Sequence, residues 1–167
     1  IALKNINKSL DYMSDTIDDF RNFYSTDKTI KEFDLEKIVN RTLNLGKSKY
    51  KLIEVIKNIE SLKMTGIENE LVQVLINILN NASDALIEHE VKEQIVIINI
   101  FKKDNKVIIE VQDNAGGIPD NIIDKIFDAR FTTKSKEKGT GIGLYMSKNI
   151  ILNSFHGDID VHNNSFE

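Results

Sequence analysis

Two asparagines and an aspartate on one face of a predicted helix could bind a metal ion together with phosphate. Asn77, Asn81 and Asp84 follow an i, i+4, i+7 spacing within a helix predicted from Asn69 to about His89. Their oxygens suit a metal ion, and amide NH2 groups suit phosphate oxygens. A solvated polar stripe is the simpler alternative, but such stripes usually carry Lys and Glu, because Asn is a poor residue in helix interiors. Taken alone, this spacing leaves both interpretations open.

A glycine loop that begins with a second acidic residue follows a predicted strand. The sequence VQDNAGGIPD covers residues 111–120, and Asp113 ends the strand. A side chain at the end of a strand is well placed to contact a ligand, and Gly116 and Gly117 permit positive φ angles and close ligand approach. The same glycines would also fit an ordinary turn, so this signal alone is weak.

A second glycine-rich segment, GTGIGL at residues 139–144, leads into a predicted helix. Free N–H groups and the positive end of the dipole at a helix N-terminus favour phosphate binding. The segment is not a Walker loop, because no Gly-Lys-Ser/Thr follows. It is not a Rossmann fingerprint either, because the spacing differs and no strand leads directly into it.

The elements that must position these residues alternate between strands and helices. Asp34 can cap a helix of about 12 residues from Leu35, Gly46 near its end favours a left-handed cap, and Asp104-Asn105 supplies a hairpin turn. Strands are predicted at 30–33, 51–59, 94–101, 106–112 and 158–162, and further helices at 69–89, 121–127 and 143–155. Helices combined with an antiparallel hairpin give an α+β class.

Four segments in this order resemble the sequence boxes of sensor histidine kinases. NELVQVLINILNNASDAL (69–86) resembles their asparagine box, and DNAGGIP (113–119) resembles the first glycine box. IFDARFTTK (126–134) resembles the phenylalanine box, and GTGIGLYMSKNII (139–151) the second glycine box. The resemblance covers nearly the whole chain. It implies a two-layer α/β sandwich shared with gyrase-type and chaperone ATPases, with a mixed, mostly antiparallel sheet under three helices.

The resemblance also implies a role for each matching residue. Asp113 would accept a hydrogen bond from the adenine amino group, Asn81 would ligate Mg²⁺, and Asn77 would face the phosphates of ATP. Residues 129–140 would form a loop over the triphosphate. The expected catalytic residues are Asn77 and Asn81, and the expected ATP-binding residues are Asn77, Asn81, Asp84, Asp113, Gly117, Ile118, Thr133, Lys134, Gly139, Thr140, Gly141, Ile142, Gly143 and Leu144.

The sequence departs from the family pattern at three places. Ala115 stands where many members have glycine, and we expect that this position does not need a positive φ. Ala129-Arg130 replaces a common Pro-aromatic pair, and Arg130 fits either a surface charge or a contact of the loop. The chain also stops where the family usually has a last strand, so we expect an incomplete sheet.

The first segment predicts a helix that packs against another helix. Apolar residues recur with steps of 3 and 4 at Leu3, Ile6, Leu10, Met13, Ile17, Phe20 and Tyr24. An amphipathic surface helix is the alternative. By the resemblance, residues 1–26 are the second helix of the dimerisation bundle, which would make the parent protein a homodimer, and residues 27–167 are the ATP-binding catalytic domain.

Composition excludes several classes of function. The chain has 167 residues, a net charge of -4 with mixed signs and no cysteine. The charge argues against nucleic-acid binding, and the lack of cysteine rules out disulfides, cysteine-ligated zinc and thiol catalysis. The sequence has no apolar run of membrane-spanning length, so we expect a cytoplasmic fragment without membrane contact, while an inner-membrane anchor in the parent protein stays open.

The resemblance favours a kinase over an ATPase. Related hydrolases carry a Glu at the position of Asn77 to activate water, and Asn cannot act as that base. The acceptor histidine is expected outside this chain, since His89, His156 and His162 lack the expected helical context. The phosphoryl group would then pass to an aspartate of a response regulator. An ATPase of the same fold and a non-catalytic nucleotide-binding or dimerisation module are the alternatives. Hydrolysis by the isolated domain would favour the first, and failure to bind Mg-ATP the second.

Overall fold

The computed structural model describes residues 29–134 and 139–164. The predicted helix over 1–26 lies outside the described residues. Five strands are β1 (Ile30–Asp34), β2 (Glu54–Ile59), β3 (Lys63–Ile67), β4 (Ile95–Lys103) and β5 (Lys106–Asp113). Four helices are α2 (Leu35–Leu45), α3 (Glu68–Glu88), α4 (Asp120–Ile123) and α5 (Gly143–Ser154). The predicted α+β class is therefore confirmed.

The strands pair in two groups. β1 pairs with β3 in antiparallel register, from Ile30 opposite Ile67 to Asp34 opposite Lys63. β2 runs parallel to β4, and β4 runs antiparallel to β5. The β4–β5 hairpin turns at Asp104 and Asn105, whose φ angles of 49° and 63° are those of a two-residue turn that matches the strand twist. The hairpin predicted from these two residues is confirmed.

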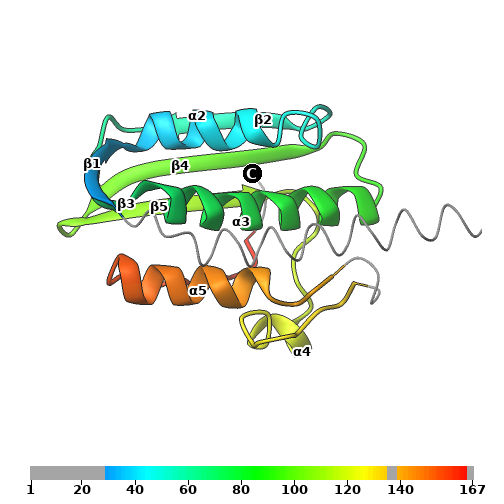
Figure 1. The fold of residues 1–167 in the computed structure, drawn as a ribbon. Helices are drawn as coiled ribbons and strands as arrows, with labels where there is room; N and C mark the ends of the chain where they lie inside the picture. The colour runs from blue at the N-terminus through cyan, green and yellow to red at the C-terminus, as the bar shows by residue number, and fades with distance from the viewer. Residues whose placement is uncertain (1–28, 135–138, 165–167) are drawn as a thin grey trace, which may run out of the picture.

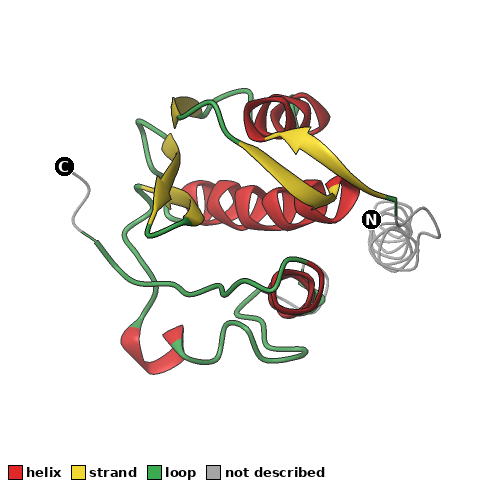
Figure 2. Ribbon diagram, turned by 90° about the vertical axis from the view of Figure 1, so that its left-hand side faces the viewer, coloured by secondary structure: helices red, strands yellow, loops and turns green. Residues whose placement is uncertain are grey.

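The long helix α3 lies at the centre of the molecule (Figure 1). It packs against α2, α5 and β5. Figure 2 shows α3 between the other two long helices. Its buried face repeats every three or four residues, and β4 buries alternate residues, as the two periodicities require. The buried core includes Phe33, Leu35, Ile38, Tyr50, Leu71, Leu75, Leu79, Leu86, Val96, Ile98 and Ile100.

Helix α2 begins as predicted and ends differently. The Asp34 side chain accepts a hydrogen bond from Lys37 N, which confirms the predicted cap. Gly46 has a φ of -92°, so the predicted left-handed cap is wrong. Its N–H instead bonds to Thr42 O at 3.2 Å. A side chain at Gly46 would collide with the Tyr50 ring, so the glycine provides space for packing.

Two segments differ from the sequence-based strands. β3 was not predicted, because Thr65 and Gly66 break its apolar pattern. A side chain at Gly66 would lie 2.5 Å from the Phe155 ring, which explains a glycine within a strand. The strand predicted at 158–162 is wrong, since the structure assigns no strand after α5 within residues 155–164. A strand needs a partner in a ladder, and the alternating sequence alone does not provide one.

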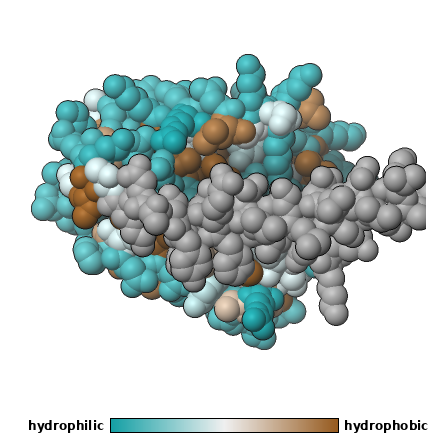
Figure 3. Space-filling view, in the orientation of Figure 1, coloured by the Kyte–Doolittle hydropathy of each residue, from teal (hydrophilic) through white to brown (hydrophobic). Residues whose placement is uncertain are grey.

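The face seen in Figure 3 is mainly hydrophilic, with separate hydrophobic groups. No helix in the described part of the chain combines the length and the apolar character needed to cross a membrane.

Candidate functional site

Asn77 connects α3 to the start of α5. Its Nδ2 donates to Gly143 O at 3.1 Å and to Ser147 Oγ at 3.2 Å. Ser147 is fully buried and also donates to Gly143 O at 3.0 Å. The structure therefore brings the predicted asparagine box and the second glycine segment together. Asn77 holds the first turn of α5 at its polar face.

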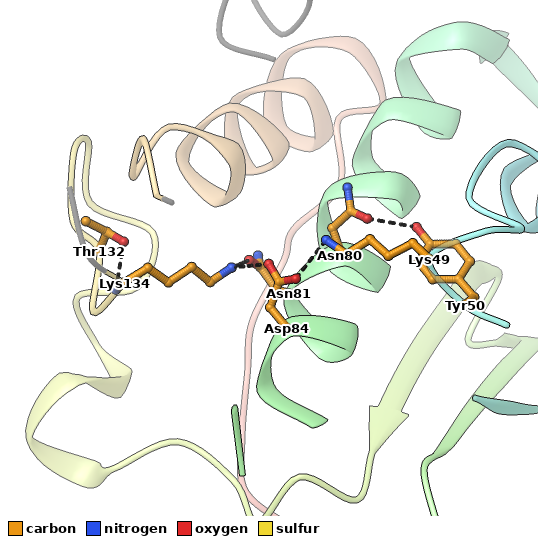
Figure 4. A network of polar contacts seen from close by, with 7 residues as sticks. All are labelled: Lys49, Tyr50, Asn80, Asn81, Asp84, Thr132 and Lys134. Carbon is orange, nitrogen blue, oxygen red and sulfur yellow. Dashed lines mark hydrogen bonds and ion pairs between the residues drawn. The ribbon is translucent and has the colours of Figure 1, made fainter. Parts of the chain in front are cut away.

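Asn81 and Asp84 lie on the same side of α3 and both contact Lys134. The Lys134 ammonium donates to Asn81 Oδ1 at 3.1 Å and to Asp84 Oδ2 at 2.6 Å. Asp84 also pairs with Lys49 at 2.7 Å. The side chain of Lys134 reaches α3 from the loop, while Lys49 approaches from the other side (Figure 4). Three residues predicted for the site thus form one cluster.

The ion pairs set the charge of this cluster. Burial by itself raises the pKa of the Asp84 carboxyl, but hydrogen bonds from Lys134 and Lys49, with the charges of both lysines, outweigh it and hold the pKa below its usual value. Burial, with the nearby negative charge of Asp84, raises the pKa of Tyr50 to about 12. The Tyr50 hydroxyl donates to Asn80 Oδ1 at 3.1 Å. Asp84 is therefore a carboxylate at neutral pH, and Tyr50 is a neutral donor.

Asp113 ends β5, and its carboxylate organises the loop that follows. Its Oδ1 accepts a hydrogen bond from Ala115 N at 2.9 Å, and no hydrogen bond among the described residues engages Oδ2. Ala115 is buried, and His89 at the end of α3 contacts its carbonyl oxygen. Ala115 does not have a positive φ, as expected, whereas Gly116 and Gly117 have φ angles of 96° and 82°. Ala115 N thereby fixes the carboxylate through one of its two oxygens.

The C-terminal segment contacts this first glycine loop. Asn163 Oδ1 accepts from Ile118 N at 2.8 Å, and its Nδ2 donates to Ile118 O at 2.7 Å. A side chain at Gly117 would lie 2.7 Å from Asn163 Oδ1. The contact with Asn163 therefore explains why residue 117 is a glycine. The role of Gly117 in ligand approach stays a prediction.

The second glycine segment closes against the phenylalanine-box segment. Arg130 N donates to Gly141 O at 2.9 Å, and a side chain on Gly141, whose φ is 63°, would lie 2.5 Å from the Arg130 carbonyl carbon. Ile142 N donates to Thr140 Oγ1 at 3.3 Å, just before α5 begins. The Lys148 ammonium of α5 lies 5.4 Å from the centre of the Phe127 ring. The predicted residues Gly139, Thr140, Gly141 and Ile142 thus lead into α5, and Gly143 and Leu144 are its first two residues.

The contacts join six of the fourteen predicted residues to α3 or to its end, in three groups. Asn77 joins α5, Asn81 and Asp84 join Lys134, and Asp113 adjoins the end of α3 through Ala115 and His89. Thr133 is exposed beside Lys134, with no hydrogen bond among the described residues. Sequence reasoning did not identify Lys49, Asn80, Ser147 and Asn163 as parts of these groups. Asn80 and Ser147 lie inside two of the quoted boxes, but their contacts, like those of Lys49 and Asn163, join residues far apart in the chain, which a local motif does not predict.

The oxygens of Asn81 and Asp84 fit a magnesium ion. Both already receive a cation, the Lys134 ammonium, and Mg²⁺ takes oxygen ligands. No three His, Cys, Asp or Glu side chains of residues 29–134 and 139–164 gather as a metal-binding group. A metal at this place would therefore need further ligands from a bound phosphate or water.

A separate shallow pocket lies away from these groups. It has a volume of about 280 Å³ and is lined by residues of β1, α2 and the start of α3, among them Phe33, Lys37 and Glu68. None of the predicted site residues lines it. This pocket is a competing location for a ligand.

A family profile and known proteins match this chain. The profile described as "Histidine kinase-, DNA gyrase B-, and HSP90-like ATPase" matches residues 66–166. The signal transduction histidine-protein kinase AtoS of Escherichia coli (strain K12) is 43% identical over 91 residues, which are 54% of this chain and 14% of that protein. The chain spans only 10–16% of the length of the curated relatives that it matches first.

Solved structures show the same fold. The nucleotide-free catalytic domain of histidine kinase ThkA superposes with a TM-score of 0.64 at 29% identity, covering 75% of this chain and 81% of that one. ThkA in complex with the response regulator protein TrrA gives a TM-score of 0.70 at 23% identity, covering 98% of this chain and 46% of that one. The predicted fold is confirmed by these likenesses.

Proposed function

The chain belongs to the family of histidine kinase-, DNA gyrase B- and HSP90-like ATPases. We propose that it binds Mg-ATP and transfers the γ-phosphoryl group to a histidine of a dimerisation domain. Its relatives in this family are sensor histidine kinases. The proposal therefore assigns it the catalytic role within a two-component sensor.

One observation carries the proposal: α3 joins two other predicted boxes through side chains of its polar face. Asn77 bonds to Gly143 of the second glycine segment, and Asn81 bonds to Lys134 at the end of the phenylalanine box. The spacing of the asparagines thus positions loops, which is not the behaviour of a merely solvated stripe. A ligand between these segments would meet carboxamides, an ammonium and the N-terminus of α5, a combination that suits a polyphosphate.

Each group has a chemical role in this proposal. Asp113 Oδ2 accepts a hydrogen bond from the adenine amino group, while Ala115 N fixes Oδ1. Asn81 holds the magnesium ion, which neutralises charge on the triphosphate. Asn77 has no basic group to activate water, so the site protects ATP from hydrolysis and positions it for a protein nucleophile. Backbone N–H groups of Gly141, Gly143 and Leu144 hold phosphate oxygens, while Ile142 N bonds to Thr140 Oγ1.

The partners belong to the same proposal. The acceptor histidine lies on a segment outside this chain, and the phosphoryl group then passes to an aspartate in a response regulator receiver domain. ThkA is a relative in fold that was solved in complex with such a regulator, TrrA. We further propose that the parent protein dimerises through residues 1–26 and that this part of it works in the cytoplasm.

The charge on Asp113 tests the adenine assignment. Asp113→Asn should weaken ATP binding in calorimetry tenfold or more, since loss of a hydrogen bond to a charged group costs about 1.5–3 kcal/mol. Asp104→Asn removes the same charge in the distant β4–β5 turn, where the positive φ of 49° suits Asn, and should leave the affinity unchanged. Equal ATP affinities in wild type and Asp113→Asn would remove Asp113 from its role.

Phosphoryl transfer needs an added acceptor. The chain incubated with ATP radiolabelled at the γ-phosphate should not label itself, but should label a separately supplied dimerisation domain that carries the histidine. Strong self-labelling at His89, His156 or His162 would contradict the assignment. Steady-state release of phosphate without any acceptor would instead support an ATPase.

A further inference from the structure

Lys134 places a positive charge on the Asn81 oxygen, to which the metal is assigned, and on the neighbouring oxygen of Asp84. Its ammonium lies 3.1 Å from Asn81 Oδ1 and 2.6 Å from Asp84 Oδ2 (Figure 4). The side chains of Lys134 and Asp84 keep only 24% and 32% of their exposure. This contact is therefore better shielded from water than the Lys63–Glu32 pair, whose side chains keep 64% and 59% of their exposure, and it is correspondingly stronger.

The contact ties the phenylalanine-box segment to α3. Lys134 N donates to Thr132 Oγ1 at 3.1 Å, which gives the backbone a local turn before the side chain extends to the helix. Arg130 N bonds to Gly141 O at 2.9 Å, so residues 130–134 are held at one end by the second glycine segment and at the other by α3. Releasing Lys134 would free the second attachment only.

A divalent metal and the Lys134 ammonium cannot share these oxygens. Two cations on the same pair of atoms would lie within about 4 Å of each other, and their repulsion there is substantial even at an intermediate effective dielectric constant. Lys49, at 2.7 Å from Asp84 Oδ1, contacts the other oxygen of the carboxylate and has no contact with Asn81. The competition therefore concerns Lys134 alone.

We infer that Lys134 is an internal cation that occupies the Asn81–Asp84 oxygen pair until a divalent metal displaces it, and that this displacement releases residues 130–134 from α3. The inference rests on the proposed function, because that function assigns the metal to Asn81. Binding of the metal would then release residues 130–134, the segment that the proposed function places beside the triphosphate. Lys134 then acts as a positioning residue that makes the site respond to Mg²⁺.

Mn²⁺ alone, measured by water-proton relaxation, tests the competition in the 167-residue chain. Lys134→Met should bind Mn²⁺ about two- to fivefold more tightly than wild type, the range typical of a partly exposed ion pair. Lys49→Met is the matched control, because it removes the same charge at nearly the same distance from Asp84 without clearing Asn81. Lys49→Met should raise the affinity for Mn²⁺ clearly less than Lys134→Met does. Equal gains in the two variants would mean a simple charge effect and would overturn the inference.

Amide hydrogen exchange tests the release. Mg²⁺ without nucleotide should accelerate exchange at Phe131–Lys134 in wild type at least threefold over Na⁺ at the same ionic strength. Lys134→Met should show the faster exchange without Mg²⁺, and Lys49→Met should behave like wild type. Exchange that does not respond to Mg²⁺ in wild type would overturn the inference.

The two proposals fail separately. Metal competition and release without any ATP binding in calorimetry would refute the nucleotide function and leave the displacement intact. ATP binding together with unchanged Mn²⁺ affinity in Lys134→Met would refute the displacement and leave the function intact.

Discussion

At the scale of single residues, polar side chains assigned to a ligand also hold the chain together. Asn77 uses its Nδ2 to fasten α5, and Asp113 uses Oδ1 to fix Ala115 N. A carboxamide or carboxylate has two polar atoms, so one can hold the backbone while the other meets a ligand. Positioning and recognition are thus combined in the same residues, and changes at these positions should affect stability as well as binding.

The donor at Asn77 should contribute measurably to stability. Asn77→Asp replaces an N–H donor by an oxygen that faces Gly143 O and Ser147 Oγ, so the free energy of unfolding should fall by about 1–3 kcal/mol. Asn80→Asp keeps the acceptor for the Tyr50 hydroxyl and should cost only a few tenths of a kcal/mol. Urea denaturation measures both. Equal losses would show that the Asn77 donor has no special role.

The sequence predicted which residues lie near one another better than it predicted their contacts. The helical spacing of Asn77, Asn81 and Asp84 placed them on one side of α3. The pairing of Asp84 with both Lys134 and Lys49 was not predictable from spacing, because it depends on residues 50 and 35 positions away in the chain. Asn163 was missed for the same reason.

At the scale of elements, α3 is the axis on which the others are arranged, and its N-terminus is anchored by charge. Glu68 lies in the first turn, where a negative charge complements the helix dipole. It pairs with Lys31 of β1 at 2.5 Å and with Arg41 of α2 at 2.7 Å. One carboxylate therefore links three elements on the side of the molecule remote from the predicted ligand residues.

This anchor should make stability depend on pH. The hydrogen bond from Lys31, followed by that from Arg41 and both charges, lowers the pKa of Glu68 against an opposing contribution from burial. Because the pKa of Glu68 is lower in the folded than in the unfolded chain, the Glu68 carboxylate stabilises the folded state above the unfolded pKa of 4.5. This stabilisation is lost as the pH falls through the pKa of Glu68 in the folded state. The free energy of unfolding should therefore be larger for wild type than for Glu68→Gln at pH 7. The difference between the two proteins should shrink below about pH 4.5.

Denaturation at a series of pH values measures this difference. Glu32→Gln breaks a pair with Lys63 whose side chains are both more than half exposed, and should stay close to wild type at pH 7. A difference between wild type and Glu68→Gln that is the same at pH 7 and pH 3 would contradict the role of the Glu68 charge.

Elements with their own periodicity were predictable from the sequence, and those that depend on a partner were not. α2, α3, α5 and the β4–β5 hairpin follow from apolar spacing, a cap and turn residues. β3 exists because β1 lies beside it, and its Gly66 is explained by Phe155 from the far end of the chain. Residues 158–162 alternate like a strand but have no ladder partner in the described structure.

At the scale of the whole molecule, the proposed function requires ATP to bind between the end of β5 and the start of α5, across the polar face of α3. The helix contacts both elements, which is what makes a single site possible. The family implied this arrangement before any coordinates, since four boxes in a fixed order specify a known fold. Only the structure shows which contacts hold these boxes together.

The most direct measurement is an NMR titration of the isotope-labelled chain with Mg-ATP, which reports every amide at once. If ATP binds across α3, the largest shifts should appear in two stretches, residues 113–118 and 139–144, together with Asn77, Asn81 and Lys134. The β1–α2 pocket near Phe33 and Lys37 should not respond. Shifts confined to that pocket, or to one of the two stretches without the other, would contradict a single nucleotide site across α3.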